Sequence, residues 1–553
     1  MIFDFHYHLL FKHYIHKKPE PALAANIKTT GIAHLLNEIL GGPFDSQSSP
    51  TMVGKSPLKI GVVAILSLEY AFANQVLHIL GVNFSGTLPL DKGLFDKTKD
   101  GETTYYEEFN NQVGHYVTHQ PALSQAPYNI NFLKKSDWTG KTVAQIETAL
   151  NADNKKYMAF SIEGGHNLSN VPIRKGSRSL SPELQLKDIQ DNSPLDFISM
   201  NLCHLSYIPE QTLGGFAQGV NKMSQIAFKS NDFMPKNEFG ITELGKKVIK
   251  QAYTHPQKPM LIDVKHMSLY SRLHFYKIRD KIILENPEAG RLPIISSHTG
   301  FTFTTVTDYI QNKRFRSKTG TEEGDPISIV EPENRKIGRT NDLFNKGLFS
   351  NPWTINLFDE DIVEIMESRG MIGISLDQRI LGSSNPAVDS VRDKYYEGEH
   401  VARLEWEKLF RDGQMPGAEG LEFLESIFAP RNERHVMLLC HHIVYAVRVG
   451  YEHINWIDGR SPWDCVCIGS DFDGLINPIN GFDDVESLKN LEEQLRKYLP
   501  QADKYLKKEN GRKAFDYDPD GNLKRESLES AIKKFLYTNG LRFTARYLTN
   551  WTE

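Results

Sequence analysis

Eight short apolar segments recur along this chain of 553 residues, and their order restricts the possible folds more than any other feature. They are rich in Val, Ile, Leu, Phe and Met without alternation, which is the pattern of parallel strands covered by helices on both faces. Amphipathic stretches, typical of such helices, lie between several of them at residues 242–253, 359–368, 433–449 and 485–498. The eight segments are residues 2–5, 60–66, 157–162, 197–201, 260–264, 293–296, 371–375 and 465–469.

Strands that alternate with helices predict an α/β fold built from right-handed β-α-β units. Eight strands is the number that a (β/α)8 TIM barrel needs, although an open doubly wound sheet would alternate in the same way. Seven of the segments run directly into polar residues, with the endings DFHYH, SIEGGH, NLCH, DVKH, SSH, SLD and GSDFDG. Barrel enzymes carry their reactive groups at the carboxyl ends of the strands, so these endings favour the barrel.

The domain organisation that follows is a single barrel over residues 1–553 with three long insertions. They cover about residues 69–135, 299–355 and 376–431, and each follows a predicted strand. Segments in that position are expected at the catalytic mouth, as lids or pocket walls. No internal repeat or linker marks a second domain.

Composition excludes some classes of function. The chain has 64 basic and 69 acidic side chains and a net charge of −5, which argues against a nucleic-acid partner. Its first ten residues lack the basic start of a signal peptide, and no apolar run is long enough for a transmembrane segment, so we expect a cytoplasmic protein. Four cysteines, expected as buried thiols, are too few for a disulfide framework: Cys203, Cys440, Cys465 and Cys467.

The first strand ends in two histidines, His6 and His8, spaced two residues apart. The period of a strand places both imidazoles on one side, where they can bind the same cation. Among 19 histidines such a pair also arises by chance, and each could equally be a hydrogen-bonded residue at the barrel rim.

Three further strand ends carry metal-ligand chemistry. Glu163 precedes Gly164 and Gly165, and a carboxylate there can bridge two cations, with a helix cap or an ion pair as the alternative. His266 and His298 end two successive strands, 32 residues apart, and would lie side by side as ligands of a second cation. For His166 we expect a packing role.

Asp471 completes the set on the last strand, in the sequence IGSDFDG. A carboxylate beside divalent ions stays ionised and can accept a proton from water. Asp473, two residues further, is expected to cap the loop. Ligands drawn from His, Glu and Asp without Cys are typical of a catalytic rather than a structural site.

These motifs resemble the membrane dipeptidase (renal dipeptidase) family of zinc peptidases in the amidohydrolase superfamily. The resemblance runs in order along nearly the whole chain. IEGGH at 162–166 and IGSDFDG at 468–474 are its more specific motifs. The others are MNLCH at 200–204, GITELGKKVIKQA followed by LIDVKHMS, PIISSHTG, and the helical stretch from 441 to 449.

The resemblance implies a (β/α)8 barrel that binds two divalent metal ions, zinc first among the candidates, and hydrolyses dipeptides through a metal-bridging hydroxide. His6 and His8 would bind one ion, His266 and His298 the other, and Glu163 would bridge them. Asp471 would transfer the proton. His204 would contact the substrate and stabilise the oxyanion. A small peptide substrate and a homodimer are the partners that the resemblance implies.

Three departures from the family pattern bear on the substrate. The first motif of the family pairs His with Asp, where this chain has His6 and His8. The arginine that binds the substrate carboxylate in the family is matched by Ile355, with Arg335 or Arg339 as possible substitutes. The three insertions are also longer than is typical.

Two alternative functions stay open at this stage. The same superfamily contains metal-dependent phosphoesterases and other amidohydrolases with an HxH first strand, and the basic run at 312–316 could bind a phosphate. The second alternative is a non-catalytic barrel used for binding. Metal content and a comparison of peptide with ester substrates would separate them.

Overall fold

The structure is a computed structural model, and it describes eighteen stretches of the chain. These are residues 1–17, 21–40, 42–70, 73, 90–170, 181–208, 211–219, 240–311, 316–318, 327–330, 335–336, 349–351, 353–382, 399–409, 431–456, 459–506, 513–515 and 526–552.

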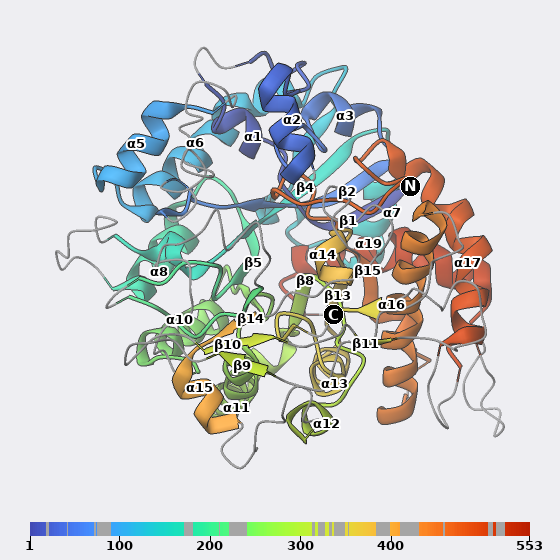
Figure 1. Cartoon of the computed structure of the whole chain (residues 1–553). Coiled ribbons are helices and arrows are strands. Elements are labelled where there is room, and N and C mark those ends of the chain that lie inside the picture. Colours follow the sequence, from blue (N-terminus) through green and yellow to red (C-terminus); the bar gives the residue numbers. More distant parts are fainter. Residues whose placement is uncertain are drawn as a thin grey trace.

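Eight parallel strands close into a barrel at the centre of the molecule (Figure 1). The ring closes because β2 pairs with β4 while β1 pairs with both β2 and β15, which excludes the open doubly wound sheet. A short strand, β3 (Ile130–Phe132), adds to β4 outside the ring. In ring order the strands are β1 (Ile2–Tyr7), β2 (Leu58–Ile65), β4 (Lys156–Ile162), β5 (Phe197–Asn201), β7 (Leu261–Asp263), β8 (Ile295–Thr299), β13 (Met371–Ile374) and β15 (Val466–Ile468).

All eight predicted apolar segments overlap these strands, so the (β/α)8 barrel is confirmed. The largest difference is in β8, which the sequence predicted at 293–296. The strand starts at Ile295 and continues through His298 to Thr299, because its polar residues pair with β13 on one side. His298 therefore lies within the strand, and not beyond its end as expected.

Helices surround the strands in Figure 1, and the four predicted amphipathic segments are among them. They form α10 (Glu243–Thr254), α13 (Asp359–Glu367), α16 (Arg431–His453) and α17 (Leu491–Tyr505), the last preceded by a short 3-10 turn. Thr242 caps α10, since its hydroxyl accepts from the backbone N–H of Gly245 at 3.1 Å. The other long helices are α6 (Tyr105–Leu123), α7 (Val143–Asn151), α8 (Pro182–Asn192), α11 (Leu269–Glu285) and α19 (Asn539–Leu548).

The first strand shows how the sequence separates the two faces of the barrel wall. Phe3 and Phe5 face outward onto α19, where the rings of Phe5 and Phe543 lie 5.1 Å apart. His6 faces inward, and its ring lies 3.9 Å from that of His298 on β8. Both faces of the strand are therefore buried, the outward face by apolar side chains against α19 and the inward face by reactive side chains in the barrel interior.

The predicted insertions contribute in two ways. Within 69–135, α6 packs Phe109, Val113 and Tyr116 into the core, so this part covers the barrel wall. Described parts of the other two meet in an antiparallel sheet, while much of both lies outside the described residues. Their position over the mouth stays a prediction. The sheet order is β6 (Gln218–Gly219), β14 (Glu399–Val401), β10 (Ile327–Val330) and β9 (Arg316–Lys318).

The remaining described elements are short. The helices are α1 (Phe11–Tyr14), α2 (Gly31–Leu40), α3 (Pro50–Lys55), α5 (Lys92–Asp100), α12 (Val306–Gln311), α14 (Gln378–Leu381), α15 (Arg403–Leu409) and α18 (Leu528–Lys533). The strands β11 (Arg335–Lys336) and β12 (Phe349–Ser350) pair with each other.

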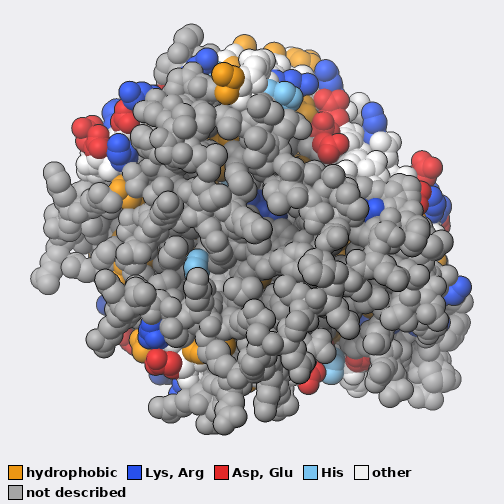
Figure 2. Space-filling view, in the orientation of Figure 1, with side chains coloured by type: hydrophobic (Ala, Val, Ile, Leu, Met, Phe, Trp, Pro, Cys, Tyr) orange, Lys and Arg blue, Asp and Glu red, His pale blue; other side chains and the backbone are white. Residues whose placement is uncertain are grey.

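The remaining expectations from composition can be compared with the structure. All four cysteines are free and buried, as predicted. At the described part of the face in Figure 2, Lys and Arg side chains are interspersed with Asp and Glu. Among the described residues, no helix is both long enough and apolar enough to span a bilayer.

Close packing beneath the mouth generates a first prediction. A Cβ on Gly373 of β13 would lie 1.9 Å from the backbone oxygen of Ser297, and one on Gly469 would lie equally close to it. Backbone atoms cannot move aside cheaply, so Gly373→Ala should destabilise the protein by about 1–3 kcal/mol.

The control for this variant is Gly114→Ala. Gly114 lies exposed on α6 with no atom within 4 Å of the added methyl, and there alanine should stabilise by about 0.5–1 kcal/mol. Urea unfolding of both variants gives the comparison, and equal stability of the two would contradict the packing argument.

Candidate metal centre

The seven residues singled out in the sequence meet at the carboxyl ends of the barrel strands. His6 lies within β1 and His8 just after it, Glu163 follows β4 directly, and His298 lies within β8. The other three lie three residues beyond the ends of their strands, namely His204 after β5, His266 after β7 and Asp471 after β15. Six of the eight strands thus contribute one reactive group or two.

The carboxylate of Glu163 lies at the centre of this group. Its Oε1 is 3.3 Å from His6 Nε2, and its Oε2 is 3.1 Å from His8 Nε2. On the other side, Oε1 lies 3.4, 3.6 and 3.8 Å from the Nε2 atoms of His204, His266 and His298. One carboxylate therefore faces five imidazoles, which is the position of a group shared between two cations.

The remaining distances divide the donors into two overlapping sets that share Glu163. Asp471 Oδ1 lies 3.8 Å from His6 Nε2 and 3.6 Å from His8 Nε2. The structure groups His6 and Asp471 with His298, and His204 with His266, the donor atoms of each set lying within 4.8 Å of one another. Because His266 and His298 also approach to 3.0 Å between their Nε2 atoms, either can join either set. The pairing of ligands inferred above stays a prediction.

Buried polar atoms without partners test whether the residues fit a cation. Among the described residues, both ring nitrogens of His6, Oε2 of Glu163 and Oδ1 of Asp471 are buried without a hydrogen-bond partner. Each such atom costs on the order of 1–3 kcal/mol when it stays unpaired. Imidazole and carboxylate donors at these spacings suit a divalent metal ion, and its binding would give a partner to the carboxylate oxygens and to one nitrogen of His6.

The ionisation of the donors is consistent with metal binding. Burial lowers the pKa of His266 to about 3 and that of His298 well below its usual value, so both rings are neutral, the form that binds metals. Burial alone would raise the pKa of Glu163, but the charges of His6 and His204 hold it well below the usual range.

Asp4 and Asp263 fix the backbone beneath the site, and no sequence pattern predicted either role. Asp4 Oδ1 accepts from the backbone N–H of Ser470 at 2.9 Å and of His6 at 3.2 Å, while its Oδ2 accepts from the Ser470 hydroxyl at 2.5 Å. Asp263 Oδ1 accepts from the N–H of Lys265 at 2.9 Å and of Ser297 at 3.2 Å. The two carboxylates orient the segments that carry the neighbouring donors.

The backbone is strained at two of the donors. His266 has φ 69° and Asp471 has φ 65°, left-handed values that are rare outside glycine. Such strain costs about 1–3 kcal/mol and is found mostly at functional sites. The loop after Asp471 is held by Asp473, which accepts from the N–H groups of Gln47 at 2.7 Å and Ser48 at 3.1 Å, as its predicted capping role requires.

His204 has a buried acidic partner that sequence reasoning missed. Glu69 Oε1 lies 3.0 Å from His204 Nδ1 and also accepts from the Ser206 hydroxyl at 2.6 Å. Burial would lower the pKa of His204, but the charges of Glu69 and Glu163 raise it to about 10. His166, expected to have a packing role, is buried, and its Nε2 lies 3.2 Å from the carbonyl oxygen of Ser67.

Ile355, the residue matched to the substrate-binding arginine, is buried in a small apolar cluster with Ala217 and Trp353 and brings no charge to the site. Arg339 and most of the basic run at 312–316 lie outside the described residues, as does the side chain of Arg335.

Lys265 is a cation near the site that the sequence analysis did not consider. Its Nζ is buried and has no hydrogen-bond partner among the described residues. Burial lowers its pKa to about 8 in spite of the charges of Asp471, Asp377 and Asp263.

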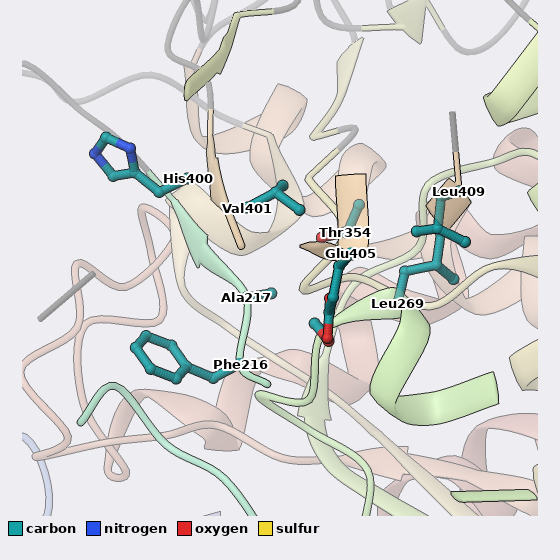
Figure 3. A pocket seen from close by; sticks show the side chains of 9 residues that line it. Phe216, Ala217, Leu269, Thr354, His400, Val401, Glu405 and Leu409 are labelled. Carbon is teal, nitrogen blue, oxygen red and sulfur yellow. The ribbon is translucent and has the colours of Figure 1, made fainter. Parts of the chain in front are cut away.

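A small pocket flanks the segment that follows His266 (Figure 3). The N–H of Ala217 donates to the carbonyl of His266 at 3.0 Å, which joins the pocket wall to the metal centre. Its one carboxylate, Glu405, accepts from the Ser268 hydroxyl at 2.7 Å, and burial raises its pKa to about 7. None of the predicted site residues lines this pocket. Its lining consists of Phe216, Ala217, Ser268, Leu269, Thr354, His400, Val401, Glu405 and Leu409.

Comparison with known proteins gave matches among solved structures only. No protein-family model matches the chain, and neither does any curated protein. The dipeptidase AC, a metallopeptidase, is 15% identical with a TM-score of 0.41, and the match covers 98% of this chain and 97% of that one.

Two further solved structures illustrate the same level of similarity. A metallopeptidase from Rhodobacter sphaeroides, liganded with a phosphinate mimic of the dipeptide L-Ala-D-Ala, is 14% identical over 99% and 98% of the two chains, with a TM-score of 0.43. The probable dipeptidase PvdM from Pseudomonas aeruginosa is 14% identical over 91% and 89%, with a TM-score of 0.44.

Metal removal and return generate the second prediction. Adding Zn²⁺ to metal-stripped protein should raise its unfolding temperature, because a ligand at 100 times its Kd stabilises by about 2.7 kcal/mol per site. Glu163→Gln, which keeps the shape but removes the shared charge, should lose the larger part of this shift. Glu288→Gln, whose side chain is 86% exposed, is the control. Equal zinc shifts in the two variants would show that Glu163 is not a ligand.

Proposed function

We propose that this chain is a binuclear metallohydrolase of the membrane dipeptidase type, which cleaves the amide bond of dipeptides or similar acyl-amino acids. The observation that carries the proposal is the position of Glu163, whose carboxylate lies within 3.8 Å of the Nε2 atoms of five histidines from four barrel strands. Two divalent ions, with zinc as the first candidate, would be held by His6, His8, Glu163, His266 and His298. When bound, such ions lower the pKa of water and polarise a carbonyl group.

Asp471 is the proposed proton carrier. Its Oδ1 is buried without a hydrogen-bond partner among the described residues, and it faces the same space as His6 and His8. Burial raises the pKa of its carboxyl group above the usual value, which suits a group that must accept a proton and then release it. In the proposed reaction it takes a proton from water and passes it to the leaving amine.

His204 is the proposed donor to the substrate carbonyl oxygen. Glu69 accepts a hydrogen bond from Nδ1 of His204. The protonated ring therefore directs its Nε2–H toward the centre of the site, where Nε2 lies 3.4 Å from Glu163 Oε1. A donor held in this way stabilises the negative charge that develops on a carbonyl oxygen during hydrolysis. Glu69 acts through His204 as a positioning residue.

Lys265 is the proposed partner of the substrate carboxylate, since Ile355 cannot serve. Lys265 lies two residues after Asp263, the last residue of β7, and directly precedes His266; its backbone N–H donates to the Asp263 carboxylate. A buried ammonium without a hydrogen-bond partner is costly unless an anion pairs with it. A free carboxylate on the substrate supplies that anion.

The third prediction concerns the reaction itself. Zinc-loaded protein should release amino acids from a dipeptide panel that includes D-residues at the C-terminal position. Asp471→Asn should retain metal and lose about 10²–10⁴-fold in kcat, the contribution of a positioned acid-base group. Asp308→Asn, at an exposed position on α12, is the matched control.

Three outcomes would redirect this assignment. An Asp471→Asn variant with near-normal turnover would remove Asp471 from the reaction. Phosphoester cleavage with no release from peptides would favour the phosphoesterase alternative, and absence of bound metal would favour a binding barrel.

The fourth prediction tests Lys265 by comparing dipeptides with their C-terminal amides. Wild type should prefer the free acid in kcat/KM, and Lys265→Met should reduce that preference about 10- to 100-fold, because a hydrogen bond to a charged group contributes about 1.5–3 kcal/mol. Lys265→Arg should retain the preference. Lys247→Met, with a side chain 61% exposed, controls for loss of a charge. An unchanged preference in Lys265→Met would exclude the proposed contact.

A further inference from the structure

We propose a third metal site, formed by His13, His115 and His119, which takes a single divalent cation of the zinc or copper class. These residues share no ligand with the centre around Glu163, and the inference does not depend on the proposed hydrolase activity. One ligand nitrogen from each of the three rings lies within 4.8 Å of the others.

Two of the three ligands come from one helix. His115 and His119 lie one turn apart on α6 (Tyr105–Leu123), a spacing that places both imidazoles on the same face. Their ring centroids are 4.5 Å apart. Two histidines at this spacing are a common pair of metal ligands on helices.

The third ligand comes from α1 (Phe11–Tyr14), 102 residues earlier in the chain. The ring of His13 lies 5.2 Å from that of His115 and 5.3 Å from that of His119, between centroids. α1 is therefore placed so that its histidine completes a triangle with the pair on α6.

The hydrogen bond of His13 to the backbone fixes which nitrogen faces the triangle. His13 Nε2 lies 2.6 Å from the carbonyl oxygen of Pro21, so Nε2 carries the proton and donates it. Nδ1 is then unprotonated, and it faces His115 Nε2 at 3.1 Å. Metal-binding histidines are oriented in this way, with one nitrogen donating to a carbonyl and the other free to bind.

The spacing is close to that of two nitrogens on one ion. With metal–nitrogen bonds of about 2.0–2.1 Å in a tetrahedral site, two ligand nitrogens lie about 3.4 Å apart. The distance of 3.1 Å between His13 and His115 needs to change by only a few tenths of an ångström. A hydrogen bond between those two rings is the alternative, and the zinc-binding measurements below distinguish it from a metal site.

The ligand set and its burial restrict the cation. Three neutral imidazoles without a carboxylate suit Zn²⁺, Cu²⁺ or Ni²⁺ and are poor ligands for Ca²⁺ or Mg²⁺. His13 is buried, whereas His115 and His119 are half-buried, so an ion can enter from solvent and keep a water molecule.

Such an ion would link α1, which follows the metal centre in the chain, to α6, which packs against the barrel wall. α1 begins three residues after His8, and α6 packs against the barrel wall. A hydrogen bond of 3.0 Å, from the N–H of Leu10 to the hydroxyl of Tyr116, already contributes to joining the two segments. The third ion would add a stronger link between them and hold the end of β1 in place.

The test counts metal ions in full-length protein and separates the two sites by mutation. After Zn²⁺ loading and gel filtration, we expect wild type to retain one zinc more per chain than His119→Ala or His115→Ala. His453→Ala, with a side chain 48% exposed on α16, should match wild type. Equal zinc content in all four proteins would overturn the third site.

A second measurement keeps the test valid if a variant folds poorly. Glu163→Gln, weakened at the main centre, should still bind one Co²⁺ or Cu²⁺ with the absorption spectrum of nitrogen ligation, and should still gain unfolding temperature with Zn²⁺. Both signals should disappear in the double variant Glu163→Gln/His119→Gln. If they persist there, the ion is bound elsewhere and the proposal fails, whatever the peptidase assays show.

Discussion

Closure of the barrel between its first and last strands is the constraint on which the rest of the structure depends. β1 pairs with β15 through Asp4 and Ile468, and the Asp4 carboxylate accepts from both the backbone and the hydroxyl of Ser470. This contact brings together residues more than 460 positions apart in the chain. It places Asp471 beside His6 and His8, so the chemistry at the mouth exists only when the ring is closed.

The same closure also brings polar and charged groups together in the barrel interior, where they lack water and need partners. The barrel gathers five imidazoles around Glu163, four of them buried, and leaves several of their polar atoms without protein partners among the described residues. A core of this kind is unfavourable by itself, because unpaired buried polar groups lose hydration without compensation. A bound divalent cation would pair with these atoms and offset that cost. Metal binding and the final packing of the mouth should therefore be thermodynamically linked.

Much of this arrangement could be predicted from sequence because the barrel repeats one simple rule. Each apolar segment became a strand, and each polar ending reached the same rim, so the residues from His6 to Asp471 were found without knowing their distances. Glu69 escaped because it lies four residues beyond β2, in a stretch without strand periodicity. His13 and the α6 pair escaped because only the packing of α1 on α6 joins them. Within 69–135, α6 covers the barrel wall, but the length of this insertion alone could not show whether it covers the wall or forms a lid.

The departures from the dipeptidase pattern change the charge of the site in opposite directions. An imidazole at His8, where the family has a carboxylate, removes one negative charge from the site, and Lys265 adds a buried positive charge. Loss of the arginine at Ile355 removes one positive charge elsewhere. Before any cation binds, the carboxylates of Glu163, Asp471 and Glu69 are thus opposed by the charges of Lys265 and His204. With two divalent ions the site would be strongly positive, so an anionic group on the substrate would be attracted even without the arginine. The position of the substrate carboxylate would differ, because the ammonium group of Lys265 comes from the residue before His266 at the barrel wall and not from the loop that carries Ile355.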